Sequence, residues 1–375
     1  MRNYFGWLVF FSVAWWLVLL PYDYHVLSVP LDVIHAFAYS VITQIAGPYT
    51  FQSDSSGMYL LLLICPVLGA VTALSILLPG AKKLRERGLR FTAVLMRYFI
   101  VLELWKYGWI KLIKLQFYLP EPNTLYSPLG DLSKDIAYWS VIGSSHSYVV
   151  FMGLAEVIAG TMLLFTRTRF AGLLLALGIF VNVLMVNISF DISVKLFVIT
   201  TLAMVAGLLA DYPNQFRYLF GFPVKEEVKV ITANNSKNNW LHALIVSVFV
   251  VEAIYPAVIM EHVNDDAIAR PAHHGAYAVL NHASIRRLFV HRQGYIILEN
   301  AAGERLDLKI TSANNAVFAL LNERDQSKSS LTWNSSRAVT WKNKKTADTL
   351  YLKELPYREL PLLQDSFHWF SDDFH

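Results

Sequence analysis

The sequence predicts an α-helical polytopic membrane bundle of about seven transmembrane helices, followed by a small antiparallel β sandwich or barrel domain. Of the 375 residues, 55% are hydrophobic and only 16% are charged, which is more apolar than a soluble globular protein. Several segments stay apolar over the roughly 20 residues that a helix needs to cross the hydrocarbon. Beyond the last of them, short stretches alternate between apolar and polar residues, as strands do.

The expected spans divide the chain into four parts. The first span ends its apolar run at Pro21 without a small-x-small cleavage pattern, so we expect it to remain as an anchor rather than a signal peptide. The spans are 4–20, 57–79, 93–115, 147–166, 170–189, 192–210 and 240–259. The parts are an N-terminal two-span segment with an interfacial helix (1–92), a four-helix core (93–210), a cytoplasmic linker with the last span (211–261) and an extracytoplasmic β domain (262–375).

Basic residues indicate the orientation, because Lys and Arg in short loops are retained on the cytoplasmic side. They collect in loops 82–90, 167–169 and 211–239, which alternate with loops where Lys134 is the only basic residue. We therefore expect a bacterial inner-membrane protein with a cytoplasmic N-terminus and a periplasmic C-terminal domain. The net charge of +4 then reflects membrane orientation, and nucleic acid is not an expected partner.

Three segments outside the spans carry further expectations. Apolar residues at helical spacing over 31–45 predict a helix, either in the outer membrane interface or packed on the outer end of the bundle. The Pro-, Gly- and Ser-rich segment 118–146 is expected to dip into or cap the outer mouth of the bundle. Stretches such as 294–300 and 349–355 alternate with period two and predict the strands of the β domain.

The third span is unusual because it carries charges. Glu103, Lys106, Tyr107 and Lys114 fall within an arc of roughly 100°, so this face should look into the bundle. Glu103 is expected near mid-depth, whereas Lys111 and Lys114 lie near the outer surface, where lysines snorkel. A mid-span charge costs about 2.5 to 3.5 kcal/mol, so Glu103 and Lys106 should persist around a ligand or as an i,i+3 ion pair that fixes packing.

Other expected spans add polar groups, and together they predict one polar cavity that opens outward. These groups are Glu156, Asn182, Asn187, Asp191, Lys195 and Glu252. Structural alternatives stay open for several of them. Asp191 can cap a new helix and pair with Lys195 four residues later, and the two asparagines can form hydrogen bonds between helices.

Cysteine and histidine usage narrows the chemistry. Cys65 is the one cysteine, which excludes an internal disulfide and any CxxC dithiol, so redox chemistry would need a bound cofactor or another subunit. Histidines gather beyond the last span but lack CxxC or HExxH spacing, so no metal site is expected. They are His273, His274, His282 and His291.

Residues 93–210 resemble the DoxX family of four-helix membrane proteins. The likeness rests on "YGWIKLIKLQF" with Gly108 and Lys111, on "GLAEVIAG" with Glu156, and on "NVLMVNISFDISVKL", which contains Asn187, Asp191 and Lys195. The ending "DSFHWFSDDF" is similar to the tail of larger DoxX-like proteins that add an outer β domain. The resemblance implies a membrane subunit of a complex that delivers electrons to quinone, as in sulfur or thiosulfate oxidation, or a role in detoxifying oxidants at the membrane.

Three functional interpretations follow. In the first, the polar cavity binds a quinone or similar polar-headed lipid and serves an oxidoreductase system, with Glu103, Lys106, Glu156, Asp191 and Lys195 handling protons. Its ligand-binding residues would be Tyr107, Lys111, Asn182 and Asn187. In the second, the bundle is a non-enzymatic anchor whose outer β domain recruits a periplasmic protein partner or a lipid. In the third, the spans conduct a solute or proton, which the sequence favours least because it has no clear pair of broken helices.

Overall fold

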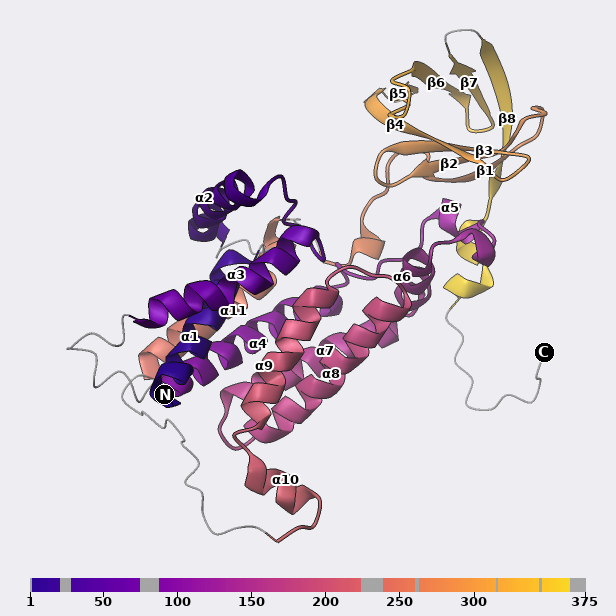
Figure 1. The fold of residues 1–375 in the computed structure, drawn as a ribbon. Coiled ribbons are helices and arrows are strands. Elements are labelled where there is room, and N and C mark those ends of the chain that lie inside the picture. Colours follow the sequence, from indigo (N-terminus) through magenta and orange to yellow (C-terminus); the bar gives the residue numbers. More distant parts are fainter. Residues whose placement is uncertain are drawn as a thin grey trace. The chain divides into compact units, whose positions relative to one another are not determined.

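The computed structural model describes residues 2–20, 28–74, 88–223, 239–259, 263–314, 316–343 and 346–364. The chain forms two compact units, which we call the helical unit (1–116 with 147–263) and the barrel unit (117–146 with 264–375) (Figure 1). The basic residues 82–87, most of the linker at 224–238 and the ending "DSFHWFSDDF" lie outside the described residues, as does Pro21.

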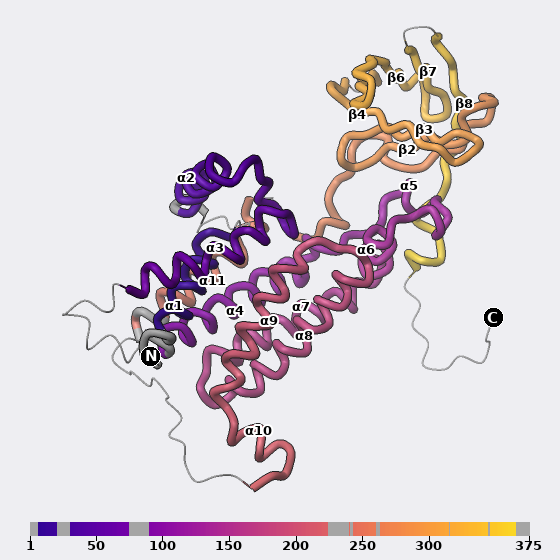
Figure 2. Tube along the Cα trace, viewed as in Figure 1, coloured from indigo at the N-terminus to yellow at the C-terminus, as the bar shows by residue number. Residues whose placement is uncertain are grey.

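Each segment that the sequence expects to span the membrane contains a helix among its described residues. The helices of this unit are α1 (Arg2–Leu19), α2 (Ser28–Ala46), α3 (Ser56–Ala73), α4 (Gly88–Leu112), α7 (His146–Leu164), α8 (Arg169–Ser189), α9 (Lys195–Leu209), α10 (Pro213–Leu219) and α11 (Asn239–Ile259). The helix predicted over 31–45 is confirmed as α2. In Figures 1 and 2, α1 lies beside α3 and α4, and α4 also packs against α9 and α11.

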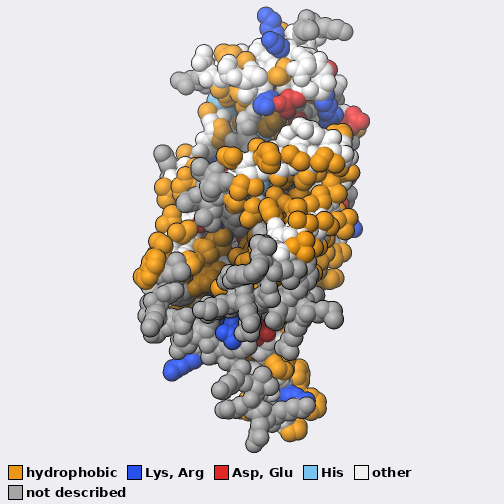
Figure 3. Space-filling model, turned by 60° about the vertical axis from the view of Figure 1, so that its left-hand side comes forward, with side chains coloured by type: hydrophobic (Ala, Val, Ile, Leu, Met, Phe, Trp, Pro, Cys, Tyr) orange, Lys and Arg blue, Asp and Glu red, His pale blue; other side chains and the backbone are white. Residues whose placement is uncertain are grey.

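The apolar helices indicate a membrane protein. Among the described residues, α3, α7 and α8 are long and apolar enough to cross a membrane, and the pair α9 and α10, bent by 86°, makes a fourth if it counts as one span. Where Figure 3 shows described side chains over the middle of the molecule, most of them are hydrophobic. Exposed apolar residues on these helices include Leu63, Val67, Val71, Phe151 and Ile158. A lipid bilayer is the environment that such a surface requires.

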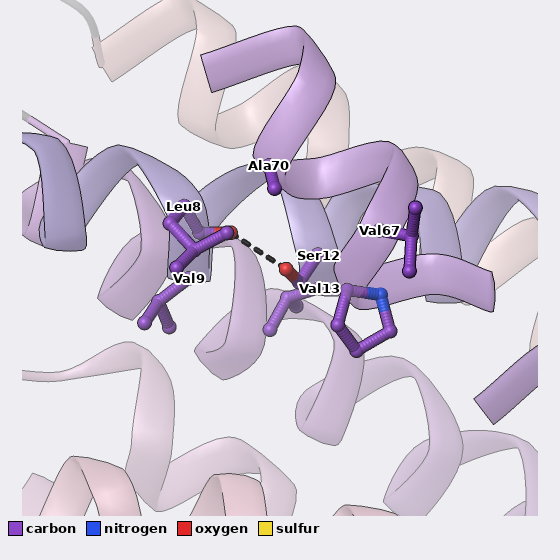
Figure 4. A pocket seen from close by; sticks show the side chains of 7 residues that line it. Leu8, Val9, Ser12, Val13, Val67 and Ala70 are labelled. Atoms are coloured by element: carbon purple, nitrogen blue, oxygen red, sulfur yellow. Dashed lines mark hydrogen bonds between the residues drawn. The ribbon is translucent and has the colours of Figure 1, made fainter. Parts of the chain in front are cut away.

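The core of the helical unit joins residues from α1, α3, α4, α7, α8 and α9. Close approach of α1 to α3 depends on Gly69, where a Cβ would collide with the backbone of Ser12. Figure 4 shows side chains of both helices around a groove of about 510 Å³ beside this contact, with the Ser12 hydroxyl donating to the Leu8 carbonyl at 2.7 Å. The serine thereby satisfies its hydroxyl within its own helix, as is usual for serine in an apolar helix.

The C-terminal domain is a closed barrel, so the prediction of a sandwich or barrel is confirmed. Its antiparallel strands are β1 (Gly275–Val279), β2 (Ile285–His291), β3 (Tyr295–Asn300), β4 (Arg305–Asn314), β5 (Val317–Leu321), β6 (Lys328–Ser335), β7 (Ala338–Lys342) and β8 (Ala347–Leu355). Each strand pairs with the next along the chain, and β8 returns to β1 with Ala276 opposite Leu355. Alternate residues fill the interior, including Leu288, Ile296, Leu331 and Leu350. Closure leaves no unpaired edge strand.

The segment between α4 and α7 packs against the barrel, and its expected place at the mouth of the bundle stays a prediction. It contains α5 (Pro122–Leu125) and α6 (Lys134–Ser144), and it belongs to the barrel unit. Tyr126 covers an apolar patch on the outside of the barrel, formed by Ala276, Phe289 and Ile297. Outward-facing strand positions are normally polar because they meet water. These three are apolar, so packing against the segment removes apolar surface from water.

Candidate functional site

The candidate site is the contact between α4 and α7, where two helices approach closely. Residues Gly153, Glu156 and Gly160 are three, four or seven positions apart and therefore share one face of α7. A Cβ on Gly153 would lie 2.7 Å from the carbonyl oxygen of Gly108 on α4, and one on Gly108 would lie 2.8 Å from Val157 Cγ2. Only glycine permits this separation, which is typical of helix contacts in membranes.

Close approach brings Lys111 of α4 onto Glu156 of α7. The ammonium donates to both carboxylate oxygens, at 2.9 Å and 2.8 Å. Both side chains are more than nine-tenths buried. The lysine also lies 3.4 Å from the carbonyl oxygen of Tyr107 and 5.6 Å from the centroid of its ring. A direct contact thus joins two of the predicted site residues from different helices.

A buried pair of this kind is costly to build. Each ion loses its hydration, and mutual attraction only offsets that loss when the geometry is good and further hydrogen bonds are made. A second carboxylate oxygen and a backbone carbonyl supply those bonds here. Replacing such pairs by apolar residues is often neutral or stabilising, so stability alone does not account for this one. The arrangement offers a proton donor and a proton acceptor in contact, shielded from water.

Further charges are buried on the same helix. Glu103, Lys106 and Lys114 are 2%, 4% and 1% exposed, and each has interaction partners. Lys111 and Lys114 are buried in the protein, at 7% and 1% exposure, instead of snorkelling to the membrane surface. Lys111 is held by its ion pair with Glu156. Lys114 follows the end of α4 at Leu112 and has a φ of 53°. Glu252 of α11, the helix that packs on α4, is fully buried as well.

Asp191 and Lys195 lie together in a second cluster, at the start of α9. The Lys195 ammonium is 3.0 Å from the Asp191 carboxylate and 4.0 Å from that of Asp54. Asp54 accepts the backbone N–H groups of Lys195 and Leu196 at 2.9 Å and 2.8 Å. A residue remote in sequence thus caps α9. Of the structural alternative considered for Asp191, the pairing with Lys195 occurs, while its side chain is 89% exposed.

The two predicted asparagines of α8 differ in their surroundings. Asn182 is exposed, whereas Asn187 is only 4% exposed. Within the described part of the chain, the Asn187 Nδ2 has no hydrogen-bond partner. An unsatisfied buried amide costs about 1 to 3 kcal/mol, and such groups commonly mark ligand or water sites. The single polar cavity that the sequence predicts stays a prediction.

The histidines of the barrel unit have individual structural roles. Residues 117–146, which we call the covering segment, contribute Glu121, and its carboxylate lies 2.9 Å from His274 Nε2. The Nδ1 of His274 lies 3.3 Å from the Tyr357 hydroxyl. His273 stacks on Trp333 with ring centroids 3.9 Å apart. The Nδ1 of His282 accepts backbone N–H groups, as does that of His291. No group of three or more potential metal ligands occurs among the described residues.

Electrostatics favour the charged form of Glu121. Burial by itself raises the pKa of this carboxyl, but the hydrogen bond to His274, the nearby imidazoles and the backbone N–H of Arg292 outweigh burial and hold the pKa below its usual range. Burial lowers the pKa of His291, which therefore prefers the neutral form. The Arg292 guanidinium lies 3.5 Å from the centroid of the Tyr118 ring and contacts Asp265.

Sequence reasoning missed the polar residues that join distant segments. Asp54 caps α9, Glu121 holds the covering segment, and Glu299 accepts from Arg287 at 3.0 Å and from Arg305 at 3.1 Å. Arg305 in turn donates to loop atoms of the covering segment. The sequence offered one signal, since Glu299 interrupts the apolar run of its strand. The other two carboxylates lie in loops, where acidic residues are common and their partners cannot be read locally.

Comparison with known proteins gives a partial match. Over 81 residues the chain is 32% identical to the uncharacterized protein YwoB of Bacillus subtilis. The match covers 22% of this chain and 51% of that protein, so the chain spans about half the length of this relative. No family model matches the chain, and no solved structure matches it significantly.

Proposed function

We propose that this protein is a multi-pass inner-membrane protein that binds a quinone, or a lipid with a similar polar head, at the contact between Lys111 and Glu156, as part of an oxidoreductase system. The proposal includes seven spans, a cytoplasmic N-terminus and a periplasmic barrel. It also includes kinship with the DoxX family, whose resemblance covers the helices that carry both residues. Electrons would come from another subunit or its cofactor, because Cys65 is the one cysteine of the chain.

One observation carries the proposal: a doubly hydrogen-bonded lysine–glutamate pair is buried where two apolar helices touch. Ion pairs that only hold helices together add little over apolar packing. Ionisable groups within membrane helices more often mark ligand and proton pathways. The pair therefore supports a site whose purpose is chemical.

The residues present suit a quinone head group. Its carbonyl oxygens accept hydrogen bonds. The Lys111 ammonium directs its N–H groups at Glu156 and at the Tyr107 carbonyl, so a head group would take the place of one of these acceptors. The Nδ2 of Asn187 has no hydrogen-bond partner within the described residues. When bound, a quinone would accept two electrons and two protons and so become a quinol. Lys111 would orient the head group by donating to it, and Glu156 would hold the lysine in place and exchange a proton with it. The Lys106 ammonium lies 5.8 Å from the centroid of the Tyr107 ring.

The test is mass spectrometry of the organic extract from detergent-purified protein. We expect a quinone-type lipid to accompany the wild-type protein and to be lost from Glu156→Gln, which keeps the shape of the side chain and removes its charge. Asp191→Asn is the matched control, because that carboxylate is exposed and lies in the other cluster. Absence of any such lipid from the wild-type protein, or equal amounts in all three proteins, would refute the proposal.

A second candidate function rests on the barrel. The barrel belongs to a compact unit and its sheet is closed. Two exposed apolar residues, Leu280 and Tyr351, are neighbours on it, since the Leu280 N–H donates to the Tyr351 carbonyl. In this alternative the helices anchor a domain that recruits a periplasmic protein or lipid. Deletion of residues 262–375 would then abolish the cellular phenotype, while Glu156→Gln would leave it intact. A transport role has weaker support, since one bent helix pair is described rather than two.

A further inference from the structure

A second binding feature lies in the helical unit, away from the charged residues. A cavity of about 840 Å³ lies between α1, α2 and α3, within the size range of ligand sites. Its lining is apolar and comes from all three helices. Representative residues are Phe11, Trp15, Ala38, Ile42, Ile64 and Leu68.

The cavity offers no free hydrogen-bonding group to a ligand. Thr72 lies at its wall, but its hydroxyl donates to the Leu68 carbonyl at 2.7 Å and accepts from the Trp15 indole at 3.4 Å. Both polar groups are therefore satisfied by the protein. Any occupant must present hydrocarbon to this space, and its polar part must lie outside.

The helix that forms one wall is fixed in place by specific bonds. His35 Nε2 lies 2.8 Å from the Val18 carbonyl, and the Tyr39 hydroxyl donates to the Leu19 carbonyl. These are carbonyls of the last turn of α1, which have no partner inside their own helix. Tyr39 also stacks on Phe51 with ring centroids 4.1 Å apart. The wall is thus held open rather than collapsed onto α1 and α3.

Apolar side chains of the same helix remain uncovered beside the cavity. Phe37 is 71% exposed, Val41 is 37% exposed and Ile45 is 82% exposed, and all three line the space. Large apolar groups at these exposures require a hydrocarbon neighbour. The apolar helix α3, which is long enough to cross a membrane, forms one wall of the cavity, so a bilayer supplies that neighbour.

We propose that this cavity holds one acyl chain of a bilayer phospholipid as a retained structural lipid. A phospholipid meets both requirements of this site, because its acyl chain supplies the hydrocarbon that the apolar walls need and its polar head stays outside the cavity. This lipid is distinct from the ligand proposed at Lys111 and Glu156. It joins α2 to the two spans across a gap that side chains do not fill.

Filling the cavity tests the proposal. In Ala38→Trp a large ring occupies the space from α2, and in Ala14→Phe a ring enters from α1. Val33→Trp is the control, since Val33 lies on the same helix, is 72% exposed and does not line the cavity. Each full-length protein is purified in detergent, checked by circular dichroism and gel filtration, and examined by native mass spectrometry and phosphorus analysis.

We expect the wild-type protein and Val33→Trp to retain a stoichiometric phospholipid through extended detergent washing, and both filling variants to lose it while remaining folded. If one filling variant does not fold, the other decides. A wild-type protein without retained phospholipid overturns the inference, as does retention of a prenyl lipid instead or equal retention by all variants. Glu156→Gln should keep the phospholipid, which separates this result from the fate of the proposed quinone site.

Discussion

Breaking the Lys111–Glu156 pair should be costly, whereas replacing both partners should not. The ammonium makes two bonds of 2.8 and 2.9 Å to a carboxylate, with both side chains more than nine-tenths buried. Lys111→Met leaves a buried carboxylate without its counter-ion, for which measured losses are about 3 to 5 kcal/mol. The double variant Lys111→Met, Glu156→Leu removes both charges and keeps the volume, so its change should lie between about zero and a gain of 1 to 4 kcal/mol.

The assay is reversible unfolding in mixed micelles, followed by far-ultraviolet circular dichroism, for the wild type, both single variants and the double variant. This double-mutant cycle isolates the interaction energy of the pair. We expect each single variant to lose stability and the double variant to recover it, giving a coupling energy above about 2 kcal/mol. Single variants that cost less than about 1 kcal/mol, or a double variant as unstable as the singles, would refute the reasoning.

The remaining predictions concern other contacts and are read by thermal or denaturant unfolding. Gly153→Ala should lower the free energy of unfolding by about 1 to 3 kcal/mol, because its Cβ would lie 2.7 Å from a carbonyl oxygen of α4. Gly178→Ala is the control and should cause no loss, since a Cβ there would meet nothing within 4 Å. Equal losses would contradict the close contact. Asp54→Ala should cost about 1 kcal/mol of stability by removing the cap of α9, and Asp191→Ala should cost less than half of that. A larger loss for Asp191→Ala would instead identify Asp191 as the cap. Burial lowers the pKa of His291 from 6.5, so the unfolded chain binds the proton first and stability declines as pH falls below about 6.5; His291→Gln should flatten this decline, and an unchanged pH profile would contradict it.

The periodicity of apolar residues was sufficient to predict most helices and the strands of the C-terminal domain. Apolar runs predicted the helices of the helical unit except α10, which lies in the stretch expected to be a linker, and alternation such as that of 294–300 predicted strands. Both patterns follow from backbone geometry. The count of spans is a different matter. Charges on α4 lower its hydropathy, and the described apolar stretches of α1 and α11, Trp7–Leu19 and Ala243–Ile259, are short, so length and composition support three or four spans.

The candidate site was predictable in part. Depth and helical phase predicted an inward polar face on α4, and Lys111 and Glu156 were both selected, yet their pairing depends on the crossing at Gly108 and Gly153. Crossing geometry is a tertiary property that no local pattern encodes. The same limit explains Asp54, whose partners lie about 140 residues away along the chain and are met only in the folded state.

The most direct test of a functional head-group site at this pair is labelling with a photoreactive quinone analogue in membranes. We expect the analogue to cross-link to peptides of α4 and α7 in the wild-type protein, with excess natural quinone competing. The double variant Lys111→Met, Glu156→Leu should fold and yet lose this labelling. Labelling of the double variant at the wild-type level, or labelling spread over the lipid-facing helices without competition, would contradict the account.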